Sequence, residues 1–171
     1  MNRLAGKVAM ITGAGRGIGA AVALAELDLD TANATAERIA SEVSGVRAMA
    51  VKTDVTQSAS VVEALKQTEA TFGPLDVLVN NAGINLFCDP LTMTDEDWKR
   101  CFSVDLDGVW NGCRAVLPGM VGRGRGSIVN IVLTHAFKII PGCFPYPVAK
   151  HGVIGLTRAR SASSTRRTTC A

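Results

Sequence analysis

Tyr146 and Lys150 are the two side chains whose types and spacing offer the clearest chemistry in this sequence. They lie four positions apart, so on a helix both side chains would share one face. An ammonium near a phenol favours the phenolate, and it would bring the phenol's pKa down from about 10 toward a range useful for proton transfer. The pair therefore predicts an acid/base centre in which Tyr146 moves a proton and Lys150 tunes its pKa.

A glycine-rich turn, Thr12–Gly19, lies far upstream of this pair and follows the short apolar run 8–12. Gly13 permits a tight turn, Gly17 lets the backbone approach a pyrophosphate, and Gly19 allows close helix–strand packing. A helix that begins here would offer unpaired N–H groups and positive potential to a phosphate. No Gly-Lys-Ser/Thr closes the turn, so it is not a P-loop. A glycine-rich turn alone is weak evidence for a cofactor site, and its weight comes from the motifs that accompany it.

With the turn Asn80-Asn81-Ala82-Gly83 between them, these motifs occur in the order of the short-chain dehydrogenase/reductase family, and residues 4–158 resemble that family. The resemblance implies interconversion of an alcohol and a carbonyl by hydride transfer to or from NAD or NADP. Tyr146 would be the acid/base, and Lys150 would also hold the nicotinamide ribose. It further implies a small-molecule substrate and a homo-oligomer built on the helices around residues 97–120 and after Tyr146, the second of which a shortened chain puts in question.

The resemblance also implies the cofactor contacts. Asp54, at the end of a strand, would contact the adenine amino group, and the Asn81–Gly83 turn would flank the adenosine ribose. Glu26 or Asp28 would be the ribose acid and would favour NAD slightly, whereas Arg16 would suit the 2′-phosphate of NADP. The full set of expected cofactor-binding residues is Thr12, Gly13, Arg16, Gly17, Ile18, Gly19, Asp54, Val55, Asn81, Ala82, Gly83, Tyr146 and Lys150.

The catalytic centre departs from the family pattern at two positions. Leu133 stands where the family has a Ser that polarises the substrate carbonyl, and losing one such donor costs on the order of 10²–10³ in rate. Thr134 or His135 could replace it only where the strand has ended, since adjacent side chains on a strand face opposite ways. Asp105 stands where the family has an Asn of the proton relay; a carboxylate could hold water near Lys150, but it changes the local charge. We expect Tyr146, Lys150 and Asp105 to be catalytic; the alternative is an inactive remnant or a nucleotide-binding scaffold.

Apolar runs and helical patterns alternate along the chain, which predicts an α/β fold with a doubly wound parallel sheet, of the Rossmann type. A strand at 126–132 should precede a helix that begins near Pro145 or Tyr146, where Pro147 is tolerated in the first turn. The other expected strands are 8–12, 46–52 and 75–79, and the other expected helices are 58–72 and 95–120.

The first crossover is shorter than the family pattern, because only residues 20–25 separate Gly19 from Glu26. A crossover with its helix needs at least about 10–12 residues. Either the second strand is kept and the helix is lost, or residues 18–27 form the helix and the strand is lost. The run contains good helix formers, so we favour the helix, followed by a second helix over 28–43.

The end of the chain departs again, and we expect it to be incomplete relative to the family. Residues 1–158 would form the NAD(P)-binding domain and 159–171 a basic, disordered tail. The tail composition matches a family-like helix read in a displaced frame, which resequencing of the gene would test.

Composition excludes several classes of function. The 171 residues are 47% hydrophobic and contain no apolar run of 18, which favours one domain without a membrane span. The N-terminus has no signal-peptide core, so we expect a cytoplasmic protein. The net charge of +3 comes from four arginines near the C-terminus, and the rest of the chain is nearly neutral. The charge pattern therefore does not indicate a nucleic-acid-binding surface. Five scattered cysteines favour reduced thiols, and the spacing of His135 and His151 predicts no metal site.

Overall fold

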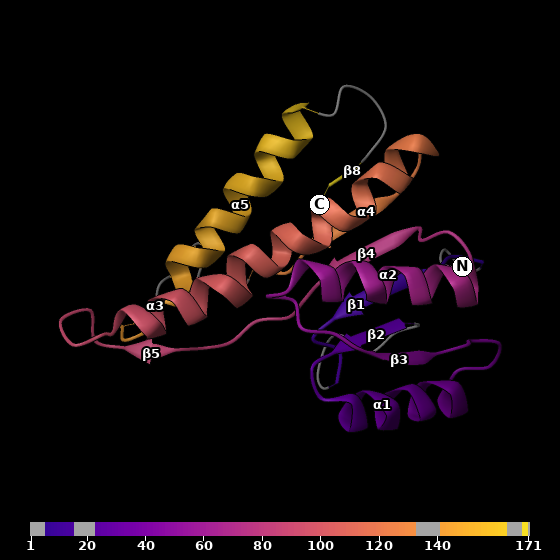
Figure 1. The fold of residues 1–171 in the computed structure, drawn as a ribbon, viewed down its shortest axis with the longest axis horizontal. Helices are drawn as coiled ribbons and strands as arrows, with labels where there is room; N and C mark the ends of the chain where they lie inside the picture. Colours follow the sequence, from indigo (N-terminus) through magenta and orange to yellow (C-terminus); the bar gives the residue numbers. More distant parts are fainter. Residues whose placement is uncertain (1–5, 16–22, 133–140, 164–168, 171) are drawn as a thin grey trace.

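A parallel six-stranded sheet is the centre of the fold in the computed structural model, which describes residues 6–15, 23–132, 141–163 and 169–170 (Figure 1). The strand order is β3-β2-β1-β4-β6-β8, and every neighbouring pair is parallel. A second, two-stranded antiparallel ribbon pairs β5 with β7. The strands are β1 (Ala9–Thr12), β2 (Ala23–Glu26), β3 (Met49–Lys52), β4 (Val77–Asn80), β5 (Phe87–Cys88), β6 (Ser127–Asn130), β7 (Phe144–Pro145) and β8 (Thr169–Cys170).

Helices cover both faces of the sheet, as a doubly wound fold requires. On one face α1 packs Ala32, Ala36 and Ile39 against Ile11 and Leu24. On the other face lie α2, α4 and α5 (Figure 1). They enclose the larger core, which includes the fully buried Leu78 and Ile128 of the central strands. The helices are α1 (Leu29–Glu42), α2 (Ser58–Phe72), α3 (Asp95–Phe102), α4 (Gly108–Gly122) and α5 (Tyr146–Ser163). No helix among the described residues is long and apolar enough to cross a membrane.

The favoured helix over residues 18–27 is wrong, because residues 23–26 form the strand β2. β2 pairs with β1 on one side and with β3 on the other, and Ala23, Leu24 and Ala25 are almost completely buried. Two ladders of backbone hydrogen bonds and burial on both faces outweigh a helix propensity of a few tenths of a kcal/mol per residue. The first alternative, in which the second strand is kept, therefore holds for the strand, while residues 16–22 lie outside the described part of the chain.

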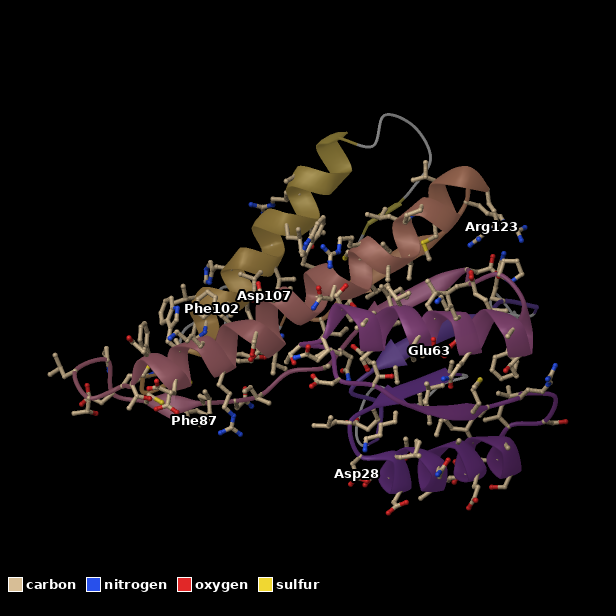
Figure 2. The ribbon with its side chains drawn as sticks, in the orientation of Figure 1. Asp28, Glu63, Phe87, Phe102, Asp107 and Arg123 are labelled. Carbon is tan, nitrogen blue, oxygen red and sulfur yellow. The ribbon has the colours of Figure 1, made fainter. Side chains whose placement is uncertain are left out.

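The second expected helix, over 28–43, is confirmed as α1. The Asp28 side chain caps its first turn by accepting from the backbone N–H groups of Asp30 and Thr31, and it lies at the start of the helix in Figure 2. A capping carboxylate satisfies orphan N–H groups and suits the positive end of the helix dipole.

The expected helix over 95–120 consists of α3, a π-helical turn (Ser103–Asp107) and α4, which follow one another without a gap. Thr94 caps its N-terminus through the backbone N–H of Asp97, as its position predicts. A π-helical turn adds one residue to the turn and is frequent at functional sites. Here the turn carries Asp105, whose side chain is fully buried.

The expected boundary at residue 158 falls inside α5, which continues to Ser163. Beyond it, Thr169 and Cys170 pair in parallel with Ser127 and Ile128 of β6. Thr169 and Cys170 thus belong to a strand, and the division of the chain at residue 158 stays a prediction.

Candidate functional site

The carboxyl ends of β1 and β4 are tied together by one amide side chain. The Asn81 side chain donates to the carbonyls of Thr12, at 3.0 Å, and Gly13, at 2.8 Å. In return the Thr12 hydroxyl accepts from the backbone N–H groups of Asn81 and Ala82, both at 3.1 Å. Gly13 has φ of +63°, and a Cβ there would lie 2.6 Å from the Ala82 Cα. The Thr and Gly of the first turn and the Asn-Ala of the second thus form one rigid unit.

A pocket of about 320 Å³ opens at this unit, where the carboxyl ends of β1 to β4 meet. Ligands of open α/β sheets bind at this edge, outside the carboxyl ends of the strands. The pocket is lined by Gly13, Ala25, Glu26, Leu27, Thr53, Asp54, Val55, Asn81, Ala82, Gly83, Ile84 and Val104.

The structure separates the two candidate ribose acids. Glu26 lines the pocket, and its carboxylate accepts from the backbone N–H of Gly15 at 3.0 Å and of Leu27 at 2.8 Å. Asp28 instead caps α1 and accepts from the Thr31 hydroxyl at 2.6 Å. Glu26 is therefore the acid placed to face a ligand in the pocket.

Asp54 lines the same pocket from the end of β3. One oxygen, Oδ1, accepts from the backbone N–H and the hydroxyl of Thr56 at 2.9 and 2.7 Å. No described residue donates a hydrogen bond to Oδ2, so that oxygen can accept from an amino group of a ligand. The neighbouring Val55 carbonyl accepts from the Asn111 side chain of α4 at 2.9 Å, which anchors this strand end.

Lys150 and Asp105 form a buried ion pair at the edge of the pocket. The Lys150 Nζ lies 3.2 Å from Asp105 Oδ1, with side-chain exposures of 3% and 0%. The same Nζ lies over the Tyr146 ring, 5.2 Å from its centroid, so the three predicted catalytic residues lie together. The cluster is next to the pocket-lining Gly83, where a Cβ would approach Lys150 Nζ to 3.3 Å and Asp105 Oδ1 to 2.7 Å.

The electrostatics of this cluster differ from the expectation for a tuned tyrosine. Burial, and then the Asp105 charge, raise the pKa of Tyr146 to about 12 from 10.0. Burial also raises the pKa of Asp105, although the Lys150 ammonium opposes that shift. Cys101, whose thiol donates to Asp105 Oδ2 at 3.6 Å, has its pKa raised to about 12, mainly by burial.

Most of the predicted site residues are therefore close together. Thr12, Asn81 and the pocket-lining residues among them, together with Tyr146, Lys150 and Asp105, lie along one edge of the sheet. Arg16, Gly17, Ile18, Gly19, Leu133, Thr134 and His135 lie outside the described residues. His151 is exposed, and its Nδ1 lies 2.8 Å from the Pro147 carbonyl.

Sequence reasoning missed two groups of residues. Thr53, Leu27, Ile84 and Val104 line the pocket through their positions after strands or on the π-helical turn. Cys101 belongs to the cluster of Lys150, Asp105 and Tyr146, and its spacing of four from Asp105 on a helical run was a usable signal. Cys88, Cys101, Cys113 and Cys143 are free thiols and are buried or half-buried, as expected.

Comparisons with known proteins agree with this geometry. The family model described as short chain dehydrogenase matches residues 7–168. The chain is 41% identical to 2-keto-3-deoxy-L-fuconate dehydrogenase of Xanthomonas campestris, across 94% of this chain and 54% of that protein. It is 34% identical to the 3-oxoacyl-[acyl-carrier-protein] reductase FabG of Staphylococcus epidermidis, across 89% of this chain and 66% of that protein. The chain thus spans from about half to two thirds of the length of these relatives.

Solved structures show the same fold. A gluconate 5-dehydrogenase from Burkholderia cenocepacia, in complex with NADP and tartrate, matches with a TM-score of 0.88 and 35% identity over 98% of this chain and 69% of that one. An alcohol dehydrogenase from Thermococcus sibiricus, complexed with 5-hydroxy-NADP, matches with a TM-score of 0.86 and 29% identity over 96% and 74%. With its parallel sheet, its interlocked glycine and asparagine turns and its Tyr–Lys pair, this chain belongs to the short chain dehydrogenase family.

Proposed function

We propose that the chain is an NAD(P)-dependent oxidoreductase that interconverts an alcohol and a carbonyl of a small molecule. The observation that carries the proposal is the position of the Lys150–Tyr146 pair beside Gly83, at the edge of the pocket that Glu26 and Asp54 line. An acid/base pair next to a dinucleotide-type pocket is the arrangement that hydride transfer to a carbonyl needs.

The pocket residues fit the adenosine half of such a cofactor. Oδ2 of Asp54 can accept from an adenine amino group, and Glu26 can accept from a ribose hydroxyl. The Glu26 carboxylate would repel a 2′-phosphate, so we favour NAD over NADP. When bound, the nicotinamide would accept or donate the hydride.

The substrate would approach from the side opposite the adenosine pocket. An open cavity of about 570 Å³ beside the β5–β7 ribbon is lined mostly by apolar side chains, among them Phe87, Phe144 and Pro147. Phe144 and Pro147 lie within two residues of Tyr146 in the sequence. Tyr146 would exchange a proton with the substrate oxygen there. A homo-oligomer remains a prediction.

A second candidate is a scaffold that binds the nucleotide without turnover. The specific observation in its favour is the ion pair between Lys150 and Asp105, together with the raised pKa of Tyr146. Leucine at position 133 lacks the hydroxyl donor that the family uses, and this also favours the scaffold.

Turnover separates the two candidates. We expect the purified chain to reduce at least one member of a panel of ketones and aldehydes with NADH, followed by the loss of absorbance at 340 nm. Tyr146→Phe should lower this rate by at least about 100-fold, because the proton donor is removed. Binding of NADH without any reduction above the Tyr146→Phe level would reject the enzyme in favour of the scaffold.

A further inference from the structure

The ammonium of Lys150 lies in a closed cluster of polar groups that come from four segments. Asp105 of the π-helical turn lies 3.2 Å from it, and the Tyr146 ring of α5 lies beneath it. The Cys101 thiol of α3 and the backbone N–H of Ile84 complete the cluster through their bonds to Asp105. Among the described residues, the remaining titratable neighbour is Cys88 of β5, whose charge acts on Cys101.

The Asp105 carboxylate is held in place by two neutral donors. Ile84 N–H donates to both of its oxygens, at 3.3 and 3.4 Å, and the Cys101 thiol donates to Oδ2. Oδ1 is thereby left facing the ammonium. Gly83 leaves the necessary room, since a Cβ at that position would lie 2.7 Å from Oδ1. A carboxylate that is held by neutral donors and excluded from water keeps its orientation toward its only described cationic neighbour.

This arrangement changes what Lys150 can do for Tyr146. An ammonium promotes the ionisation of a nearby phenol only as far as its charge is not offset by an anion held against that ammonium. Here the carboxylate lies closer to the ammonium than the ring centroid does, at 3.2 Å against 5.2 Å. The pair therefore presents a dipole to the ring in place of a net positive charge. An amide side chain at position 105 would leave that positive charge uncompensated.

We propose that Asp105 is a positioning residue that holds the Lys150 ammonium in a buried ion pair, cancels its charge, and keeps Tyr146 in its protonated phenol form. In the terms of the proposed function, on which this consequence rests, Tyr146 is then a proton donor that serves carbonyl reduction. The proton moves from the phenol oxygen to the substrate oxygen as hydride adds to the carbonyl carbon. Alcohol oxidation, which needs the phenolate, rises with pH throughout the accessible range.

The test uses the fact that Tyr146 is the one tyrosine in the chain. Phenolate absorbance near 295 nm therefore reports its ionisation directly, without cofactor or substrate. A stopped-flow jump to pH 10.5 reads the ionised fraction before the protein unfolds. An unperturbed tyrosine would be roughly three-quarters ionised at that pH. With its pKa raised to about 12, wild-type Tyr146 should be only about 3% ionised.

Asp105→Asn should lower the midpoint by at least about one pH unit, which raises the ionised fraction at pH 10.5 at least about sevenfold. Asp107→Asn is the matched control, because Asp107 lies on the same turn, is exposed, and carries the same charge (Figure 2). It should behave like the wild type. Asp105→Ser is the second charge-removing variant, used where the Asn variant loses its far-UV circular dichroism.

Two results would overturn the proposal. The first is a wild-type phenol that is more than half ionised at pH 10.5. The second is a folded Asp105→Asn or Asp105→Ser variant whose phenol titrates with the wild-type midpoint, since burial alone would then account for the protonated state. Neither result depends on cofactor binding or turnover, so failure of this proposal is distinguishable from failure of the proposed function.

Discussion

At the scale of single residues, the Tyr146–Lys150 pair was predictable from spacing, but its electrostatics were not. The sequence indicates that an ammonium and a phenol share a helix face, and the structure places them 5.2 Å apart. It also shows that Asp105 and Cys101 share the same buried space, so desolvation and a carboxylate act together on the phenol. A sequence gives the residue types and their spacing, whereas a pKa depends on the distances between the groups and on their burial.

Cys101 provides a prediction about stability at alkaline pH. Its pKa is raised from 9.0 to about 12 in the folded chain, so between these values the folded state keeps a proton that the unfolded state loses. This contribution to stability is present below pH 9 and is lost as pH rises toward 12, with a slope of about 1.4 kcal/mol per pH unit. Cys101→Ala should therefore show a shallower fall in the free energy of unfolding between pH 9 and 10.5, measured by urea denaturation.

Val109→Ala is the control for the cavity that this substitution creates. Val109 is buried in the main core and does not titrate, so its variant should lose stability at every pH and keep the wild-type slope. Equal slopes for Cys101→Ala and Val109→Ala would show that the Cys101 thiol is not the group responsible.

At the scale of elements, sequence patterns located most helices and strands but misassigned β2. The helix α2 begins and ends where its pattern predicts, at Ser58 and Phe72. The run Ala23–Glu26 has helix-forming residues and still forms a strand, because it pairs with β1 and β3. Helix propensity depends on neighbouring residues in the sequence and does not include this pairing. The π-helical turn was equally invisible, although it carries Asp105 into the cluster.

The packing of α4 on β4 gives a prediction at this scale. A methyl group at Gly112 would overlap the Asn80 side chain, which is held by the Asn130 side chain at 2.8 Å. Gly112→Ala should lower the free energy of unfolding by about 1–3 kcal/mol despite the better helix propensity of alanine. Gly122→Ala, in the same helix with open space at its Cβ, should not lower it. Urea denaturation measures the free energy of unfolding of both variants. Equal values for Gly112→Ala and Gly122→Ala would show that Gly112 does not pack closely on the Asn80 side chain.

At the scale of the whole molecule, the described residues bring the two turns of the family fold and its Tyr–Lys pair to one edge of the sheet. The order of the motifs was sufficient to predict this arrangement, because the carboxyl ends of parallel strands meet at one edge. The choice between Glu26 and Asp28 could not be made from sequence, since it depends on which carboxylate caps α1. The match to solved family structures, at a TM-score of 0.88, extends over 98% of this chain.

In the proposed function, this edge of the sheet binds a dinucleotide, with Glu26 facing its adenosine ribose. Titration of the purified chain with NADH and with NADPH, followed by nicotinamide fluorescence, tests it most directly. We expect saturable binding, with NADH bound more tightly than NADPH. Glu26→Gln should reduce the ratio of the NADPH and NADH dissociation constants about tenfold, because removing the carboxylate relieves its repulsion of the 2′-phosphate. Glu37→Gln is the control, because Glu37 is exposed, and it should leave the ratio unchanged. If the chain is folded by circular dichroism and binds neither nucleotide saturably up to millimolar concentration, this edge is not a dinucleotide site.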